Sequence, residues 1–222
     1  MNLKFNAQDP YPLIDSTVTY QEQQAHSAKV DQWLGLNEKV EEELANRLPN
    51  FGSALGEQHW IGLPLQTLQT PYTEIRSLLA LLNLKEGDHV VDLGAGYGRM
   101  GLVIDRLFPG VKFTGYEVVA ERVAEGSRLI SKLENPLIEL IVADLSVEGF
   151  KPVEAEFYFL YDFGSREAIA KTLNDLREIS MRRKITVVGR GRSSRDAIER
   201  GEPWLSQVNE PRHFEHFSIY RS

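Results

Sequence analysis

From residue 70 onward, short hydrophobic runs alternate with longer segments in which hydrophobic residues recur every three or four positions. The hydrophobic runs predict strands near residues 89–93, 111–116, 137–142, 156–161 and 184–189. The periodic segments predict helices near residues 97–108, 119–133, 165–180 and 193–200. Alternation of strands and helices at this spacing is typical of a parallel sheet covered by helices on both faces.

A further helix is predicted directly before the first strand. Thr70 is a plausible N-cap, and Pro71 suits the first helical position. The residues that follow give the helix one hydrophobic face, at Ile75, Leu78, Leu79 and Leu82. We therefore expect the core domain to span residues 70–222.

The C-terminal segment WLSQVNEPRHFEHFSIYRS predicts two strands joined by a short turn at Glu210–Pro211. No helix is predicted between them, which indicates an antiparallel hairpin on the edge of the sheet. The predicted fold class is α/β: a Rossmann-like, doubly wound, mostly parallel seven-stranded sheet with an antiparallel C-terminal hairpin.

Residues 1–69 differ from the rest of the chain. Asp15 or Ser16 could cap a helix that runs to about Leu34, and the segment EKVEEELANRL predicts a second helix. Residues 49–69 contain Gly, Pro and aromatic residues and indicate an ordered loop or lid. Because both helices are acidic and weakly apolar, we expect a helical extension or cap outside the main core.

The composition is that of a globular protein, since 42% of the 222 residues are hydrophobic and 26% are charged. The formal net charge of −7 argues against nucleic acid and membranes as partners. No cysteine is present, which excludes disulfides and a cysteine nucleophile, and His213 and His216 are poorly spaced for a metal. Neither a signal peptide nor a hydrophobic run of about 20 residues is evident, so the expected location is the cytoplasm. The oligomeric state is left open.

The most distinctive segment is VVDLGAGYG at residues 90–98, where a predicted strand runs into a glycine-rich turn and a helix. Such a turn presents free backbone N–H groups at the carboxyl end of the sheet, where open α/β folds bind ligands. Dinucleotides and S-adenosylmethionine both use this arrangement, and Gly96, Gly98 and Gly101 fit the dinucleotide spacing G-x-G-x-x-G. Asp92 favours S-adenosylmethionine, because its carboxylate would repel a pyrophosphate and suits the cationic part of that cofactor.

The same segment resembles the first motif of class I S-adenosylmethionine-dependent methyltransferases, a hydrophobic pair followed by D/E-x-G-x-G-x-G. The resemblance implies a methyltransferase with S-adenosylmethionine as its cofactor. It also implies contacts between the amino-acid portion of that cofactor and the loop residues Asp92, Gly94, Ala95, Gly96 and Gly98.

Three later strand ends supply further candidate residues. Glu117 ends the second predicted strand, where an acidic side chain can accept hydrogen bonds from ribose hydroxyls. By the resemblance, Asp144 and Leu145 contact the adenine, although Asp144 could instead cap a short helix. Tyr161 and Asp162 follow the fourth strand and face the methyl group in this fold. They are the candidate catalytic residues, as acceptors for a nitrogen nucleophile, with a structural role as the alternative.

Residues 70–101 are also similar, in order and spacing, to the Dot1-type lysine methyltransferases, in which a Y-G-E-type loop precedes the glycine motif. This weaker resemblance implies that Thr70, Tyr72 and Thr73 close over the methionine end of the cofactor. Because the chain is acidic and wrapped DNA requires a cationic surface, the likeness bears on fold and cofactor and not on a histone substrate.

The leading functional prediction is methyl transfer from S-adenosylmethionine to an acceptor that the sequence does not identify. An amine such as a protein lysine is one candidate acceptor, and a small molecule is another. Two alternatives stay open: an NAD-dependent oxidoreductase, which the overlapping glycine string permits, and a non-catalytic interaction module with the methyltransferase fold.

Overall fold

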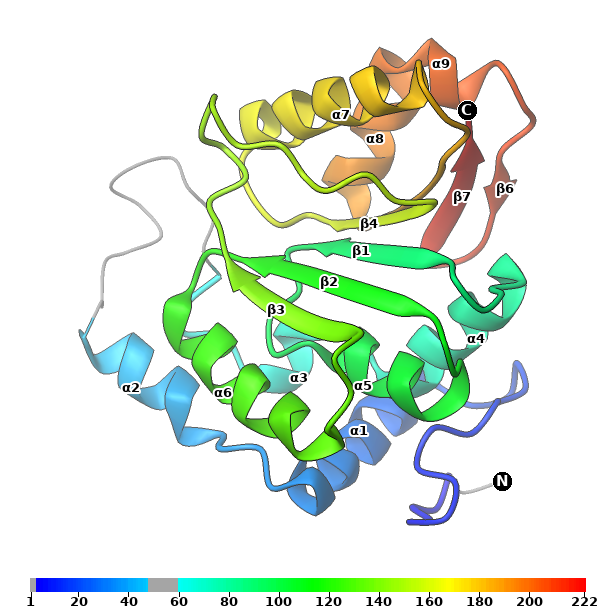
Figure 1. Cartoon of the computed structure of the whole chain (residues 1–222). Coiled ribbons are helices and arrows are strands. Elements are labelled where there is room, and N and C mark those ends of the chain that lie inside the picture. The colour runs from blue at the N-terminus through cyan, green and yellow to red at the C-terminus, as the bar shows by residue number, and fades with distance from the viewer. Residues whose placement is uncertain (1–2, 48–59) are drawn as a thin grey trace.

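The computed structural model describes residues 3–47 and 60–222, which form a seven-stranded sheet with helices on both faces (Figure 1). The strands are β1 (His89–Leu93), β2 (Lys112–Glu117), β3 (Ile138–Val142), β4 (Phe157–Tyr161), β5 (Thr186–Arg190), β6 (Arg212–His213) and β7 (Phe217–Arg221). Their order in the sheet is β3-β2-β1-β4-β5-β7-β6. Strands β1 to β5 are parallel, whereas β7 is antiparallel to both of its neighbours. The predicted fold class is confirmed.

The described helices are α1 (Tyr20–Leu34), α2 (Lys39–Arg47), α3 (Leu65–Leu68), α4 (Tyr72–Leu82), α5 (Arg99–Leu107), α6 (Ala120–Ile130), the short 3-10 helix η1 (Ser131–Leu133), α7 (Arg166–Ser180), α8 (Arg192–Gly201) and α9 (Pro203–Ser206). Helices α1, α4, α5 and α6 lie on one side of the sheet, and α7 to α9 lie on the other (Figure 1). Val90 and Val91 of β1 belong to two different buried clusters, one on each face. This double burial explains why the neighbouring residues Val90 and Val91, which point to opposite faces, are both hydrophobic.

The helix before β1 has the predicted hydrophobic face but not the predicted start. Ile75 and Leu79 are buried, as are Leu78 and Leu82. The helix begins at Tyr72, and Pro71 stands outside it with an extended backbone (φ −58°, ψ 142°). Thr70 therefore does not cap this helix, and that prediction is wrong.

The C-terminal hairpin is confirmed, but its predicted turn at Glu210–Pro211 is wrong. The segment expected to form its first strand contains α9 instead, with Pro203 in the first turn, where its missing N–H is not needed. The turn lies between β6 and β7, where the Phe214 N–H donates to the Phe217 carbonyl at 2.9 Å.

Helix α1 and the segments beside it pack into the main core, which differs from the expectation of an extension outside it. Tyr11, Val30 and Leu36 belong to the same buried cluster as the hydrophobic residues of α4 and α5. The sequence concealed this packing because most of what α1 buries is polar, namely Gln23, His26, Ser27 and Asp31 beside Val30.

The start of α1 is fixed by a cap later than the predicted one. The Thr19 hydroxyl accepts from the Glu22 N–H, and the Glu22 carboxylate accepts from the Thr19 N–H. This reciprocal pair is a capping box, so Asp15 and Ser16 precede the helix. Residues 49–59 of the predicted loop or lid lie outside the described residues, and its remaining part contains α3.

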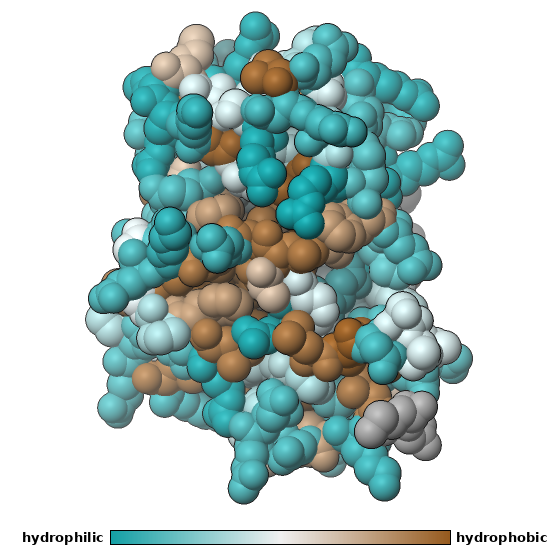
Figure 2. Space-filling model, turned by 90° about the vertical axis from the view of Figure 1, so that its right-hand side faces the viewer, coloured by the Kyte–Doolittle hydropathy of each residue, from teal (hydrophilic) through white to brown (hydrophobic). Residues whose placement is uncertain are grey.

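Figure 2 views the side of the molecule on which α4 and the β6–β7 hairpin lie in Figure 1. Hydrophobic residues form a band across the middle of this face, with hydrophilic residues above and below it (Figure 2). Exposed apolar atoms are common on folded proteins and do not by themselves mark a site. Among residues 3–47 and 60–222, no helix combines the length and the hydrophobicity needed to cross a membrane.

Candidate cofactor-binding site

A cavity of about 260 Å³ opens where β1, β2, β3 and β4 end. Its lining combines the glycine loop, the residues after β2 to β4 and the segment around α3, represented by Trp60, Gln69, Gly94, Gly96, Glu117, Asp144, Leu145, Tyr161 and Phe163. Seven of the residues predicted from the sequence line this cavity: Gly94, Gly96, Glu117, Asp144, Leu145, Tyr161 and Asp162. Five separate chain segments therefore meet at the edge of the sheet where this fold binds ligands.

The glycine loop approaches its neighbours too closely for side chains. Gly94 has φ +102° and Gly96 has φ +55°, in the left-handed region that favours glycine. A Cβ atom on Gly94 would collide with Phe163, and one on Gly96 would collide with the amide of Gln69. Bare backbone at these two positions is thus required by the packing of Phe163 and Gln69 against the loop.

Asp92 is the one acidic residue of the loop without a partner in the described part of the chain. Its half-buried side chain makes no hydrogen bond or ion pair there, and it lines a small cavity of about 50 Å³ beneath Gly94. Burial, with the nearby Glu117 carboxylate as a second cause, raises the pKa of Asp92 to about 7. A carboxylate with a raised pKa and no partner is stabilised by a nearby cation and not by an anion, because positive charge favours its ionised form.

Glu117, in contrast, is already tied to the loop. Its Oε2 accepts from the Gly96 N–H and its Oε1 from the Val119 N–H, both at 2.9 Å. A carboxylate has about four lone-pair sites, so two remain for hydroxyl donors. Glu117 can therefore hold a ribose diol while it fixes the loop.

Asp144 combines the two roles that the sequence left open. Its Oδ1 accepts from the Ser146 N–H at 2.8 Å and from the Ser146 hydroxyl at 2.6 Å. Its Oδ2 has no hydrogen bond within the described residues, and the residue lines the cavity beside Leu145. One oxygen thus stabilises the turn while the other is available to an amino group.

Asp162 lines the cavity, but its carboxylate is turned toward α8, so its role as an acceptor for the substrate nitrogen stays a prediction. Its Oδ1 accepts from the Ser194 N–H at 2.7 Å and its Oδ2 from the Ser193 N–H at 3.2 Å. Both amides belong to the first turn of α8, where a carboxylate is stabilised by unpaired N–H groups. Asp162 adopts φ +32°, and its backbone carbonyl accepts from the Trp60 indole N–H at 2.8 Å.

Tyr161 lies where the cofactor cavity meets a more open, polar cavity beyond β5. Its hydroxyl has no hydrogen-bond partner among residues 3–47 and 60–222, and the guanidinium of Arg190 lies 4.1 Å from its ring centroid. Arg190 is itself paired with Glu74 at 2.8 Å. The phenol is therefore held by its ring and keeps its hydroxyl free for a ligand.

Tyr72 and Thr73 do not reach the cavity, which corrects the implied closure over the methionine end of the cofactor. Tyr72 is fully buried and donates to Asp31 Oδ1 at 2.9 Å, and Thr73 donates to Gln23 Oε1 at 3.0 Å. Their helix turns these side chains toward α1. Thr70 lines the smaller cavity near Asp92.

Two further residues of the predicted loop motif differ in their position. Ala95 lines the small cavity, and its N–H donates to the Tyr116 carbonyl at 2.8 Å, which ties the loop to β2. Gly98 lines neither cavity, because it packs against Leu140 and Ile130. Its role in the present packing is to let α5 begin close to the sheet.

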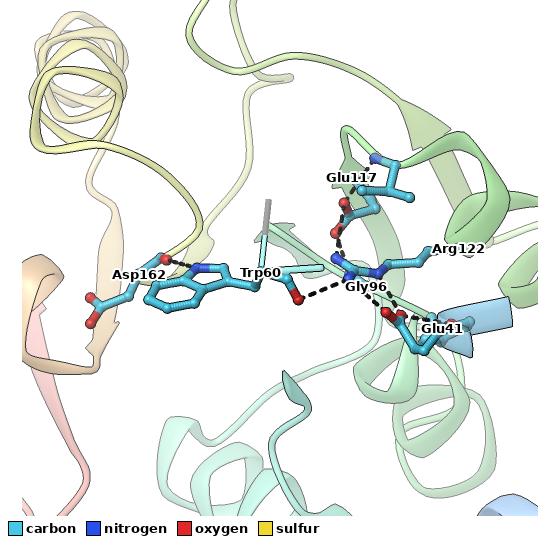
Figure 3. Close-up of polar contacts among 8 residues, drawn as sticks. Glu41, Trp60, Gly96, Glu117, Arg122 and Asp162 are labelled. Carbon is cyan, nitrogen blue, oxygen red and sulfur yellow. Dashed lines mark hydrogen bonds and ion pairs between the residues drawn. The ribbon is translucent and has the colours of Figure 1, made fainter. Parts of the chain in front are cut away.

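Sequence reasoning missed the polar contacts that join the N-terminal region to the cavity. Figure 3 shows Trp60 between Asp162 and Arg122, with Glu41 and Glu117 on either side of the Arg122 guanidinium. Arg122 donates to both oxygens of Glu41, at 2.7 and 3.0 Å. The hydrophobic pattern gave no signal for these contacts, because Glu41 and Arg122 resemble ordinary charged residues of solvated helices.

The fold and the cavity define the architecture of class I S-adenosylmethionine-dependent methyltransferases: a parallel sheet with one antiparallel strand near its edge and a glycine loop after β1. A TehB-like SAM-dependent methyltransferase from Corynebacterium glutamicum is similar, with a TM-score of 0.52 and 16% identity over 83% of this chain and 98% of that chain. An RNA methyltransferase from Salinibacter ruber in complex with S-adenosyl-L-homocysteine has a TM-score of 0.50 and 22% identity over 69% and 91%. A SAM-dependent methyltransferase from Aquifex aeolicus has a TM-score of 0.50 and 17% identity over 67% and 88%. No family model and no curated protein matches the sequence.

These likenesses establish the methyltransferase fold. The closer similarity to Dot1-type enzymes is not shown by them. Because one of these similar proteins is an RNA methyltransferase, the expectation that nucleic acid is excluded as a partner is not supported. The acidic composition describes the average surface, and a substrate contacts only a small part of that surface.

Proposed function

We propose that this protein is an S-adenosylmethionine-dependent methyltransferase. The observation that carries the proposal is Asp92, an acidic side chain without a partner in the described residues, next to two glycines with positive φ. The cofactor has an ammonium group and a sulfonium group, and each would favour the ionised form of this carboxylate. The methyltransferase fold of the similar structures supports the same reading.

Each remaining part of the cofactor has a candidate partner in the cavity. Gly94 and Gly96 line the cavity without side chains, beside the place proposed for the amino-acid portion, and Glu117 keeps two lone-pair sites for the ribose hydroxyls. Asp144 Oδ2 is available to the adenine amino group, and Leu145 supplies an apolar surface for the ring. These assignments agree with the chemistry of the donors and acceptors present.

The alternative cofactor, a nicotinamide dinucleotide, fits these residues less well. It would bring a pyrophosphate to the glycine turn, between the carboxylates of Asp92 and Glu117. An anion at such a turn is normally stabilised by N–H donors and nearby cations. The Gly96 N–H, which would be one of those donors, already donates to Glu117.

For the chemical step, the bound cofactor supplies a methyl group on a sulfonium, which is already activated for displacement. The chain then has to align the acceptor and exclude water. Phe163 and Trp60 line the cavity near the end of β4, and the Tyr161 hydroxyl is placed to hold an acceptor by a hydrogen bond. Asp162 can take part through its backbone carbonyl, which already accepts an N–H donor.

We propose residues 1–69 as a cap that contributes to the site. Support comes from Glu41 and Trp60, which reach the cavity rim through Arg122 and Asp162. The acceptor remains a broad class: an amine such as a protein lysine, a small molecule or a nucleic-acid base.

The proposal is tested by incubating the protein with methyl-labelled S-adenosylmethionine and separated small-molecule, RNA and protein fractions of a cell extract. Label transferred to one fraction by the wild type, and not by Asp92→Asn, is the expected result. Binding of S-adenosylhomocysteine without transfer to any fraction would favour the non-catalytic alternative. Absence of both binding and transfer would overturn the proposal.

A further inference from the structure

Arg122 on α6 lies between two buried carboxylates, and its distances to them are unequal. It donates to Glu41 at 2.7 Å and 3.0 Å, whereas its Nη1 lies 3.9 Å from Glu117 Oε1 (Figure 3). The three side chains are at most 7% exposed. The guanidinium is thus hydrogen-bonded to Glu41 and is close to Glu117 without occupying its oxygens.

The difference between these distances matters because only part of the hydrogen-bonding capacity of Glu117 is still available. Each of its oxygens already accepts one backbone N–H, from Gly96 or from Val119. A guanidinium that moved into hydrogen-bonding distance would take the positions that the ribose hydroxyls need. A shift of about 1 Å would suffice, given usual hydrogen-bond lengths of 2.7–3.2 Å.

We propose that Glu41 is a positioning residue that holds Arg122 away from Glu117 and so keeps Glu117 open to the ribose of the cofactor. The proposal rests on the proposed function, because it assumes a nucleoside in this cavity. Helix α2 would thus contribute to ligand selection, because Glu41 lies on it. The selected ligand would be a nucleoside that carries both ribose hydroxyls.

Glu41 is itself fixed from the glycine loop. The Tyr97 hydroxyl donates to Glu41 Oε1 at 2.8 Å, and Tyr97 is fully buried between Gly96 and Gly98 in the chain. Two donors from different elements therefore hold the Glu41 carboxylate in place. This arrangement lets α2 act on the ribose position through Arg122, without touching the ligand.

The test compares adenosine with 2′,3′-dideoxyadenosine, which lacks the ribose hydroxyls, by ligand-observed NMR titration. The wild type is expected to bind adenosine about tenfold more tightly, the loss typical of charge-assisted hydrogen bonds. Glu41→Gln should lose most of this preference, because the neutral amide no longer competes with Glu117 for the guanidinium. Arg122→Gln and the double variant should both keep the preference, because Glu41 acts only through Arg122.

Glu125→Gln is the matched control, because Glu125 lies on α6, the helix that carries Arg122. Glu125 Oε1 accepts from the Asn37 N–H at 2.6 Å, so it also joins α6 to the N-terminal region, but it does not line the cavity. Its substitution should leave the adenosine preference unchanged. A control that lost the preference as Glu41→Gln does would mean that loosened packing is the cause, and would overturn the proposal.

The proposal is also overturned if Glu41→Gln keeps the preference, or if the double variant loses it while Arg122→Gln retains it. Melting curves accompany each variant. If Glu41→Gln does not fold, the test rests on Arg122→Gln. Loss of the adenosine preference in Arg122→Gln would show that Arg122 supports the ribose site, and would overturn the proposal. If the wild type binds S-adenosylhomocysteine and Glu41→Gln keeps the preference for adenosine, only this inference is contradicted. A wild type that binds no S-adenosylhomocysteine contradicts the proposed function itself.

Discussion

Asp92 and Asp162 lie at the carboxyl ends of neighbouring parallel strands, β1 and β4, yet their carboxylates have opposite surroundings. Asp162 accepts two backbone N–H groups from the first turn of α8. Asp92 has no partner in the described residues, and burial raises its pKa to about 7. The Asp162 carboxylate has its donors within the protein, whereas the Asp92 carboxylate is available to a ligand.

The difference shows that an acidic residue at a sheet edge cannot be assigned a function from its position alone. What separates the two is whether the protein already supplies donors. The fold favours the neutral form of Asp92, so the stability associated with its bound proton is present at low pH and is lost as the pH rises through about 7. A group that destabilises the free protein under neutral conditions is a strong candidate for a ligand contact.

The largest effect is expected at a third aspartate, which extends the comparison to a fully buried ion pair. Asp31 is 0% exposed and pairs with Arg99, the residue that follows the glycine loop. Asp31→Asn leaves that guanidinium without its countercharge and should lower the free energy of unfolding by about 3–5 kcal/mol. Chemical denaturation measures this loss.

Asp196→Asn is the control for that experiment, because Asp196 faces Arg192 at 3.7 Å on the exposed side of α8. Its effect should stay within about 0.5 kcal/mol. If Asp31→Asn lowers the free energy of unfolding by less than about 1 kcal/mol, this buried ion pair is not important for the packing of α1 against α5.

Asp92→Asn should change stability and ligand binding in opposite directions. At about pH 8.5, the free protein should gain roughly 1–3 kcal/mol, because a buried charge has been removed. The affinity for S-adenosylhomocysteine should fall roughly 10- to 100-fold, as expected for a lost charge-assisted contact. Thermal unfolding with and without the ligand measures both effects, and a variant that binds like the wild type would remove Asp92 from the site.

The pH dependence of binding should follow the same group. As the pH falls through about 7, Asp92 takes up a proton and can no longer pair as a carboxylate with the ammonium group of the ligand. The affinity for S-adenosylhomocysteine should therefore be constant above about pH 8 and weaken by up to about tenfold per pH unit below pH 7. Calorimetric titrations across this range should show no such slope for Asp92→Asn, and a slope that persists there would point to a different group.

The smallest effect is expected at Asp162. Asp162→Asn keeps a residue that tolerates a positive φ and retains one acceptor oxygen for the α8 amides. The cost should be about 1 kcal/mol of stability, with the affinity for S-adenosylhomocysteine unchanged within about threefold. A loss of binding comparable to that of Asp92→Asn would erase the contrast between the two aspartates.

Much of the fold was predictable because the parallel strands leave short hydrophobic runs that are bounded by turn residues and separated by helical periodicity. The runs that became β1, β2, β3, β4 and β5 were predicted to within two residues at each end. The turn after β6 was not predictable, because Pro211 is an ordinary turn residue and α9 is only four residues long. The packing of α1 was concealed because it depends on paired charges, and single charges look the same in a sequence whether exposed or buried.

The site was predictable as far as local motifs reach. The loop residues Gly94 and Gly96, together with Glu117, could be placed from the spacing of strand and turn. The orientation of a side chain could not be predicted. Asp162 turns to α8 and Tyr72 turns to α1 because their hydrogen-bond partners lie far away in the sequence. Arg122 and Glu41 were missed for the same reason, because their pairing joins residues that are 81 positions apart.

The central claim is that the glycine loop with Asp92 binds S-adenosylmethionine and not a dinucleotide. Isothermal titration of the wild-type protein with S-adenosylhomocysteine and, separately, with NAD⁺ and NADH tests it most directly. We expect saturable one-site binding of S-adenosylhomocysteine and no binding of either dinucleotide. Binding of a dinucleotide without binding of S-adenosylhomocysteine would contradict it.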